Sequence, residues 1–171
     1  MALLDIILAP DPRLTTPCDP VDAIDGGLER LMDDMLETMY AAPGIGLAAP
    51  QVGVLKRFFV VDVGDEDARD PRVFINPEIT GRSETTSVYE EGCLSLPKHY
   101  GDVERAEAIS LRYRDRCGAE RRLEADGMLA RCIQHEMDHL DGILFVDHLS
   151  ALKRRMILRR MAKVKRARET A

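Results

Sequence analysis

The sequence predicts an α+β fold, a single compact domain of antiparallel strands around a central helix with a further helix at the C-terminus. Three observations support this prediction. Short strand-like runs fill the middle of the chain, a helical segment with the pattern His-Glu-x-x-His follows them, and a long helical segment ends the sequence. Strands that precede helices, without regular alternation, are typical of α+β domains. Because we find neither an internal repeat nor a linker, residues 1–171 are expected to form one domain.

Short β-prone runs bounded by turn residues predict the strands. The first run covers residues 3–8 and precedes a turn around residues 11–13. The further strands are expected over residues 58–63, 73–76, 85–89, 109–113 and 121–125. A loop joins the first two of these strands, and a turn near Gly118 joins the last two.

Three helices are expected from the spacing of apolar residues. Leucines and methionines three and four positions apart predict an amphipathic helix over residues 24–40, with its methionines in the core and a Pro-Gly pair at 43–44 ending it. The second helix opens at residues 126–127, carries the His-Glu-x-x-His pattern and stops near residues 141–142. The third helix is expected over residues 149–168.

Size and composition indicate a globular protein. A chain of 171 residues can bury a sizeable core, and 45% hydrophobic with 32% charged residues does not suit a disordered segment. The apolar run at residues 6–9 is too short for a signal peptide, and nothing approaches the roughly 20 apolar residues of a membrane span. We therefore expect a cytoplasmic protein without membrane association. Three of its four scattered cysteines, Cys18, Cys117 and Cys132, are expected to be small buried side chains without disulfides.

The charge is distributed unevenly along the chain. Residues 151–171 hold nine Lys or Arg and one acid (net +8), whereas the first 150 residues hold 15 basic and 29 acidic side chains (net −14). The acidic body argues against general nucleic-acid binding, but the basic tail can meet a polyanion. The alternative is that this helix packs on the domain through the apolar side chains Leu152, Met156, Ile157, Met161 and Val164, with its charges solvated.

The segment His135-Glu136-Met137-Asp138-His139 carries the most specific chemistry. On a helix, two histidines four residues apart face one side, where they can bind a divalent metal, and Glu136 can act as general base. A metzincin would continue with a third histidine at position 145, which is Phe145 here, and no glutamate ligand follows within reach. The third ligand therefore has to come from another part of the chain, or the segment holds no catalytic metal.

Two upstream segments can complete such a site. Glu90-Glu91-Gly92-Cys93-Leu94-Ser95 offers Cys93 as a thiolate ligand, which would leave the fourth position of a Cys-His-His zinc-type site open to water. Gly44-Ile45-Gly46-Leu47-Ala48-Ala49-Pro50-Gln51 is small and apolar, so a substrate backbone can come close to it. The Gln51 amide can donate to a developing oxyanion. The Gly-x-Gly segment lacks the ending of a phosphate-binding loop.

Taken in order, GIGLAAPQ, EGCLSLP and QHEMDHLDG resemble the three signature segments of the peptide deformylase family. The resemblance covers nearly the whole chain and implies an α+β hydrolase that removes the formyl group from N-formylmethionine on newly synthesised polypeptides. It implies one divalent metal held by Cys93, His135 and His139, with Fe²⁺ in cells, while the ligand types also permit Zn²⁺, Ni²⁺ or Co²⁺.

The resemblance also implies roles for further residues. Glu136 is the acid–base group, and the Gln51 amide and the backbone N–H of Leu94 stabilise the oxyanion. The substrate backbone lies along Gly44, Ile45 and Gly46. The methionine pocket is expected to be lined by Ile45, Tyr89, Met128, Cys132 and the His135 ring. The basic C-terminal helix is expected to dock on ribosomal RNA near the peptide exit.

Arg131 departs from the family pattern, which has an aliphatic residue beside the methionine pocket. Two orientations are open at this position. If the stem lines the pocket and the guanidinium reaches solvent, methionine selection is kept; if the charge points inward, specificity changes. Residues 98–104 also differ from the more basic stretch of other members, which affects preferences beyond the first residue of the substrate.

Three other functions remain as alternatives. A metal-dependent peptidase would use the same histidines, although it lacks its downstream ligand. A Cys–His enzyme would use Cys93 as nucleophile, which excludes a metal-ligand role because a coordinated thiolate is a poor nucleophile. A ribosome-binding module that kept the fold without activity is the non-enzymatic alternative. His99 and His148 lie outside these motifs and receive no role.

Overall fold

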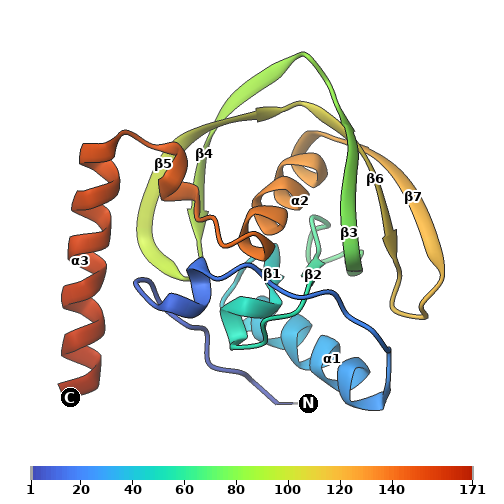
Figure 1. Cartoon of the computed structure of the whole chain (residues 1–171), viewed down its shortest axis with the longest axis horizontal. Coiled ribbons are helices and arrows are strands. Elements are labelled where there is room, and N and C mark those ends of the chain that lie inside the picture. Colours follow the sequence, from blue (N-terminus) through green and yellow to red (C-terminus); the bar gives the residue numbers. More distant parts are fainter. Residues whose placement is uncertain (1, 171) are drawn as a thin grey trace.

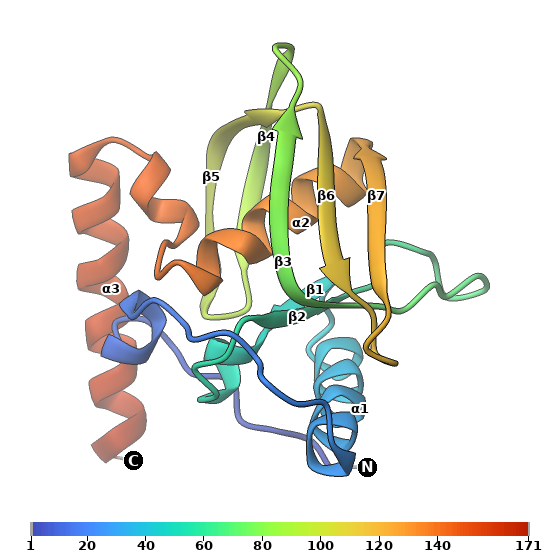
Figure 2. The ribbon, with the colours of Figure 1, turned by 45° about the vertical axis from the view of Figure 1, so that its right-hand side comes forward.

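The computed structural model describes residues 2–170, which form one α+β domain with two antiparallel sheets (Figures 1 and 2). The larger sheet has the strand order β1-β2-β3-β6-β7, and β4 pairs with β5 in the smaller one. The strands are β1 (Gly46–Ala48), β2 (Phe58–Val61), β3 (Arg72–Arg82), β4 (Thr86–Cys93), β5 (Leu96–Ala106), β6 (Ala108–Arg114) and β7 (Glu120–Asp126). The fold class predicted from the sequence is confirmed.

Helix α2 (Gly127–Leu140) contacts strands of both sheets, and the views in Figures 1 and 2 show it crossing the space that the strands enclose. Its apolar side chains Ala130, Ile133 and Leu140 are buried in one cluster with Phe59 and Phe74 of the larger sheet. The helix begins and ends at the residues expected from the sequence. Because this core holds the apolar face of α2, the positions of His135 and His139 on the same helix are fixed relative to the strands.

Helix α1 (Gly26–Ala41) packs on the other side of β1 and β2. The Asp25 side chain accepts a hydrogen bond from the backbone N–H of Leu28 and so caps its N-terminus. Met32, Met35 and Met39 are fully buried, which confirms that these methionines serve the core. Short 3-10 helices complete the described residues at Pro12–Thr15 (η1), Ala49–Val52 (η2) and Phe145–His148 (η3).

The prediction of a strand over residues 3–8 is wrong for the described part of the chain. This segment crosses the molecule in extended form and is held by single hydrogen bonds to separate elements. Leu4 N–H donates to Thr38 Oγ1, Ile7 N–H to the Gln51 carbonyl and Ala9 N–H to the Ser95 carbonyl. Since its partners belong to three different elements, no continuous ladder forms.

Strands β1 and β5 were not predicted from the sequence. Strand β5 pairs along its length with β4, from Thr86↔Ala106 to Gly92↔Tyr100, so the predicted strand at 85–89 is one arm of a long hairpin. Polar and charged side chains fill most of β5, and the strand is therefore not recognisable from a hydrophobic alternation. The expectation that Cys117 is buried is also wrong, because it is exposed in the turn before Gly118, whose φ is 85°.

Helix α3 (Ala151–Thr170) lies at the edge of the molecule and passes beside the N-terminal segment near η1 (Figure 1). Ile157 and Met161 are buried against a cluster with η3 and β5, which confirms packing through part of the apolar stripe. The other stripe residues, Leu152, Met156 and Val164, are exposed, so the helix packs on the domain through only part of the stripe. The basic side chains other than Arg154 and Lys165 also lie on the exposed surface.

Candidate active site and metal centre

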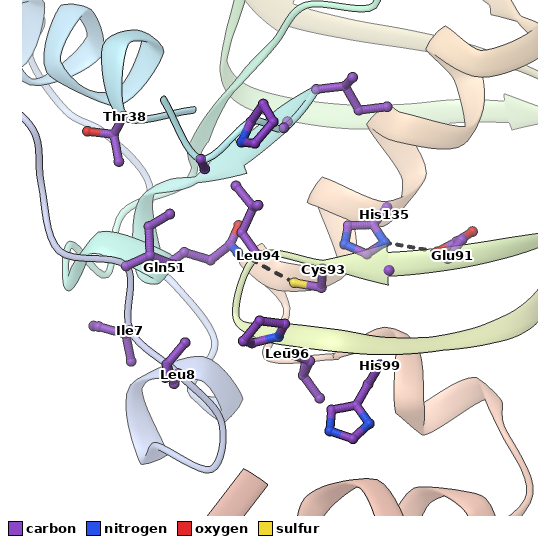
Figure 3. Close-up of a pocket in the computed structure, with 18 of the residues that line it drawn as sticks. Ile7, Leu8, Thr38, Gln51, Glu91, Cys93, Leu94, Leu96, His99 and His135 are labelled. Carbon is purple, nitrogen blue, oxygen red and sulfur yellow. Dashed lines mark hydrogen bonds and ion pairs between the residues drawn. The ribbon is translucent and has the colours of Figure 1, made fainter. Parts of the chain in front are cut away.

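A cavity of about 1110 Å³ opens between β4, α2, the segment before β1 and the extended N-terminal segment (Figure 3). The residues predicted from the sequence to form the site meet at this cavity. Those that line it are Gly44, Ile45, Gly46, Gln51, Tyr89, Cys93, Leu94, Met128, Arg131, Cys132, His135 and Glu136. His139 lies directly behind, almost fully buried. At its far end the cavity reaches Ile7, Leu8, His99 and the α3 residues Lys165 and Arg168.

Cys93, His135 and His139 form a cluster that suits one metal ion. Their ligand atoms lie within 4.8 Å of one another, and the Cys93 Sγ to His139 Nε2 distance is 3.4 Å. Two such ligand atoms bound to one tetrahedral metal would lie about 3.5 Å apart. The buried Nδ1 of His139 has no hydrogen-bond partner among the described residues. One thiolate and two imidazoles are a donor set for Zn²⁺, Fe²⁺, Co²⁺ or Ni²⁺, and the residues fit a metal.

The hydrogen bond to Glu91 determines which nitrogen of His135 faces the cluster. His135 Nδ1 lies 2.9 Å from Glu91 Oε1, as the dashed line in Figure 3 shows. Burial raises the pKa of Glu91, but hydrogen bonds from His135 and Arg105 outweigh this effect and hold its pKa at about 2. The carboxylate is therefore ionised and can only accept, so Nδ1 carries the proton and Nε2 is left for the metal.

The two histidines differ in their affinity for a proton. Burial lowers the pKa of His135, but hydrogen bonds with Cys93 and Glu91 outweigh it and raise the pKa to about 10. Burial and the charge of His135 lower the pKa of His139 well below its ordinary value. His139 thus offers a free lone pair, whereas a metal has to displace a proton at His135.

Glu136 lies beside this cluster in a nearly dry environment. Burial raises its pKa to about 7, and its Oε2 has no hydrogen-bond partner among the described residues. Strand β1 approaches it closely, since a Cβ atom added at Gly46 would lie 2.7 Å from Glu136 Oε1 and 2.9 Å from Cys132 Sγ. Only glycine leaves room for the carboxylate at this position. A carboxyl group with such a pKa can accept and release a proton near neutral pH.

Gln51 places its side-chain amide against the metal cluster. Its Oε1 accepts from the Ala48 N–H at 2.9 Å, which orients the amide. The Nε2 group donates to Ser95 Oγ at 3.0 Å and faces Cys93 Sγ at 3.5 Å, the contact drawn in Figure 3. Because Gln51 is almost fully buried, its amide is held in place as a hydrogen-bond donor next to Cys93.

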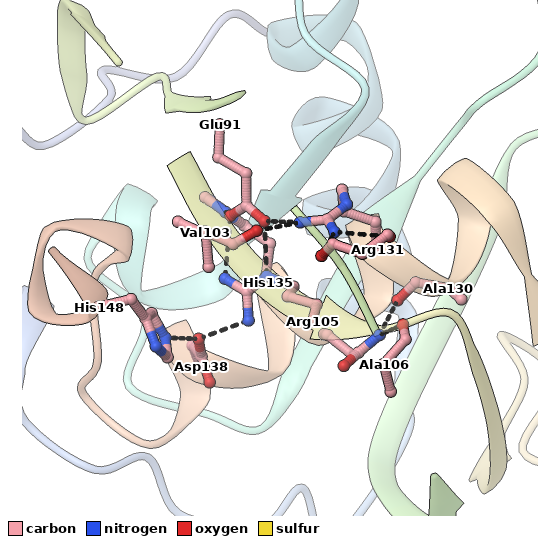
Figure 4. A network of polar contacts seen from close by, with 11 residues as sticks. Glu91, Val103, Arg105, Ala106, Ala130, Arg131, His135, Asp138 and His148 are labelled. Carbon is pink, nitrogen blue, oxygen red and sulfur yellow. Dashed lines mark hydrogen bonds and ion pairs between the residues drawn. The ribbon is translucent and has the colours of Figure 1, made fainter. Parts of the chain in front are cut away.

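A charged network behind His135 was not recognised in the sequence (Figure 4). Glu91 accepts from Arg105 Nε at 2.6 Å, Arg105 Nη2 at 2.9 Å and Arg131 Nη1 at 2.7 Å. Arg105 also donates to Asp138 at 3.0 Å, and Asp138 lies 2.8 Å from His148 Nε2. The sequence does carry one sign of this network. Glu91 is a charged residue two positions before Cys93, and a charged residue in a buried motif needs partners.

Arg131 takes neither of the two orientations considered from the sequence. Its guanidinium does not reach solvent, because only 7% of the residue is exposed. It is not a free charge inside the cavity either, because Nη1 and Nη2 both donate hydrogen bonds. Beyond Glu91, it donates to the carbonyls of Val103 at 3.1 Å and Ser87 at 2.8 Å. His148, which received no role from the sequence, bonds Asp138 and ends this network at the surface.

The fold and the cluster define a hydrolase class with a Cys-His-His metal site on an His-Glu-x-x-His helix. The family described as polypeptide deformylase matches residues 3–155. A peptide deformylase of Rhizorhabdus wittichii is 54% identical and covers 100% of both chains, and peptide deformylase 2 of Xanthomonas campestris is 58% identical over 97% of this chain and 98% of its own. The chain belongs to the peptide deformylase family.

Solved structures agree with this assignment. A peptide deformylase from Legionella pneumophila superposes with a TM-score of 0.90 at 44% identity, covering 99% of both chains. The Ehrlichia chaffeensis peptide deformylase in complex with actinonin gives a TM-score of 0.93 at 40% identity, covering 97% of this chain and 99% of that one. Among the helices that the structure describes, none has the length and apolar character needed to cross a membrane.

Proposed function

We propose that this protein removes the N-formyl group from the N-terminal formylmethionine of newly synthesised polypeptides and releases formate. The observation that carries the proposal is the meeting of Glu136, Gln51 and the Cys93-His135-His139 cluster at one cavity. Residues 1–171 act as one catalytic domain. Cys93, His135 and His139 would hold the metal, which would supply Lewis-acid chemistry for activating the formyl carbonyl and water.

Glu136 moves the proton in this reaction. Its carboxylate accepts a proton from the attacking water and returns it to the amine nitrogen as the C–N bond breaks. Its pKa of about 7, raised by burial, suits both steps near neutral pH. The hydrogen-bond donors for the developing oxyanion are the Gln51 Nε2 amide and the backbone N–H of Leu94. Gln51 and Leu94 both line the cavity, and the Gln51 amide faces Cys93 Sγ.

The substrate is held by the strand and the cavity wall. The substrate backbone is proposed to lie along Gly44, Ile45 and Gly46, which line the cavity, and a Cβ added at Gly44 would lie 2.8 Å from Leu94 Cδ1. The methionine side chain enters the part of the cavity lined by Tyr89, Met128, the stem of Arg131, Cys132 and the His135 ring. These side chains are mainly apolar, as methionine requires.

The metal in cells is proposed to be Fe²⁺, with Zn²⁺, Ni²⁺ or Co²⁺ able to use the same ligands. Anaerobic purification with metal analysis, followed by measurement of formate release from a formyl-Met peptide, tests the function and the metal together. The same peptide without the formyl group is the control. Cleavage of internal peptide bonds instead of formate release would show that the protein is a metallopeptidase.

The exposed basic residues of α3 are proposed to dock on ribosomal RNA, which would place the enzyme at nascent chains in the cytoplasm. Truncation after Ser150 would also remove the buried Ile157 and Met161, so charge reversal is the sharper test. Arg155, Arg159 and Lys163 are exposed at four-residue steps on this helix. Replacing all three by glutamate is expected to abolish salt-sensitive cosedimentation with ribosomes while formyl-Met peptide turnover is kept. Unchanged ribosome binding would contradict the docking proposal.

A further inference from the structure

A second cavity of about 580 Å³ lies next to the active-site cavity. Its lining residues are Ser87, Tyr89, Ala106, Glu107, Asp126, Gly127, Met128 and Arg131. Tyr89, Met128 and Arg131 line both cavities, so these three side chains form the wall between them. Tyr89 is 51% exposed and Met128 39% exposed, whereas Arg131 is 7% exposed. The buried part of the wall is therefore Arg131.

Hydrogen bonds from both sides of the wall fix the Arg131 side chain. Nη1 donates to Glu91, which lines the active-site cavity, and to the Val103 carbonyl of β5. Nη2 donates to the carbonyl of Ser87 at 2.8 Å and to its hydroxyl at 3.2 Å, and Ser87 lines the second cavity. The guanidinium thus spans the wall, as Figure 4 shows for its bonds to the Glu91 side. Swinging it aside would break four hydrogen bonds in a buried place.

We propose that Arg131 is a partition that limits the length of the first substrate side chain. This inference rests on the proposed function, because it takes that side chain to lie along Tyr89, Met128 and Cys132. A side chain of the length of methionine ends against the Arg131 stem. A longer side chain would clash with Arg131, which its hydrogen bonds hold in place, so a substrate with such a side chain binds poorly. Removing the Arg131 side chain joins the two cavities and provides room for the additional atoms.

Two formylated tripeptides that differ only in the first residue test the partition. One begins with norleucine, which has the length of methionine, and the other with 2-aminononanoic acid, which adds three methylenes. In Arg131→Ala the ratio of kcat/KM for the long over the short peptide is expected to rise at least about tenfold, because each buried methylene favours the longer substrate. A damaged metal site would lower kcat/KM for both peptides alike, so it would leave their ratio unchanged.

Two control variants separate the wall from the charge. Arg131→Met keeps an unbranched side chain across the wall without the guanidinium, and its ratio is expected to change less than about threefold. Arg112→Ala removes an exposed arginine whose guanidinium bonds Glu78 at 2.8 Å on the larger sheet, and its ratio should equal that of the wild type. An Arg131→Met ratio as high as that of Arg131→Ala would overturn the partition, as would an unchanged Arg131→Ala ratio.

Binding measurements keep the test independent of turnover and of folding problems. In a Glu136→Gln background, the dissociation constants of both peptides are measured with and without Arg131→Ala, where selective tightening of the long peptide is expected. If Arg131→Ala does not fold, as judged by circular dichroism and metal content, Arg131→Val carries the same expectation. Failure of the wild type to release formate from the norleucine peptide would contradict the proposed function, whereas equal selectivity of wild type and variants would contradict only the partition.

Discussion

Replacing Glu91 by glutamine tests how the charged network supports the metal site. The carboxylate is 5% exposed and accepts hydrogen bonds from Arg105, Arg131 and His135. A glutamine amide keeps one acceptor oxygen, but its NH₂ group then faces donors and the negative charge is lost. Asp138 remains as the one carboxylate that bonds Arg105 in this network. The substitution therefore leaves buried positive charge without compensation.

The magnitude follows from the burial of this network. Removing one partner of a buried ion pair costs about 3–5 kcal/mol. In proteins of this length, 1 kcal/mol lowers the melting temperature by about 2–4 °C, so a decrease of roughly 6–20 °C is expected. Loss of the hydrogen bond that orients His135 is expected to weaken metal binding by about 10–100-fold. Stability and metal affinity thus change together.

The assay measures unfolding of the metal-free protein and metal affinity by competition with a chelator. Glu78→Gln is the matched control, because Glu78 also binds an arginine through its carboxylate, but its side chain is 58% exposed. The control should lose about 0–1 kcal/mol and bind metal like the wild type. Equal behaviour of the two variants, in stability or in metal affinity, would refute the reasoning.

The pH dependence adds an independent check on Glu91. Its pKa is lowered in the folded state to about 2, below the ordinary value of 4.5. The carboxylate therefore stabilises the fold fully above pH 4.5, and this contribution is lost as the pH falls through 2. The stability difference between wild type and Glu91→Gln should narrow over that interval. A constant difference would mean that the charge of Glu91 is not what stabilises the site.

Three further predictions address single side chains. Glu136→Ala should retain metal but lose at least about 100-fold in turnover of a formyl-Met peptide, and wild-type turnover would exclude it as general base. Cys93→Ser should lose or exchange its metal, because a hydroxyl is a harder and weaker ligand than a thiolate; full metal content by elemental analysis would contradict this. Burial and the hydrogen bond to Asp62 raise the pKa of Tyr40 to about 12, so its contribution to stability is present below pH 10 and lost as the pH rises through 12. Tyr40→Phe should show a shallower alkaline loss of stability, and identical alkaline unfolding curves would argue against this contribution.

Local sequence patterns were sufficient for the helices and for part of the site. The apolar spacing of α1 and α2 follows the helical repeat, and the two histidines of α2 are one turn apart on the same face. Cys93 was a candidate ligand from the sequence, but the resemblance to a family was needed to set it apart from the other cysteines, because a local pattern does not distinguish a ligand from a buried thiol. The structure adds its 3.4 Å contact with His139, which a linear sequence cannot show.

Strand β5 and the network behind His135 required tertiary information. Residues 96–106 carry many polar side chains, and their extended form depends on pairing with β4. The same pairing brings Ser87 opposite Arg105, which puts Arg105 on the face of the hairpin that also carries Glu91, and the two long side chains meet there. A register between two strands cannot be read from either strand alone. The hydrogen-bond partners of Arg131 also lie on β4 and β5, so its direction depends on the same pairing.

The positions of the three metal ligands give the ion a mechanical role. Cys93 ends β4 in the smaller sheet, whereas His135 and His139 belong to the helix that packs on the larger sheet. A bound ion would therefore act as a cross-link between the two halves of the domain, closing a loop of about 40 residues. Free metal at 100 times its dissociation constant would add about 2.7 kcal/mol to the free energy of unfolding. Protein without its metal would lack this contribution, so metal binding and the stability of the fold would rise and fall together.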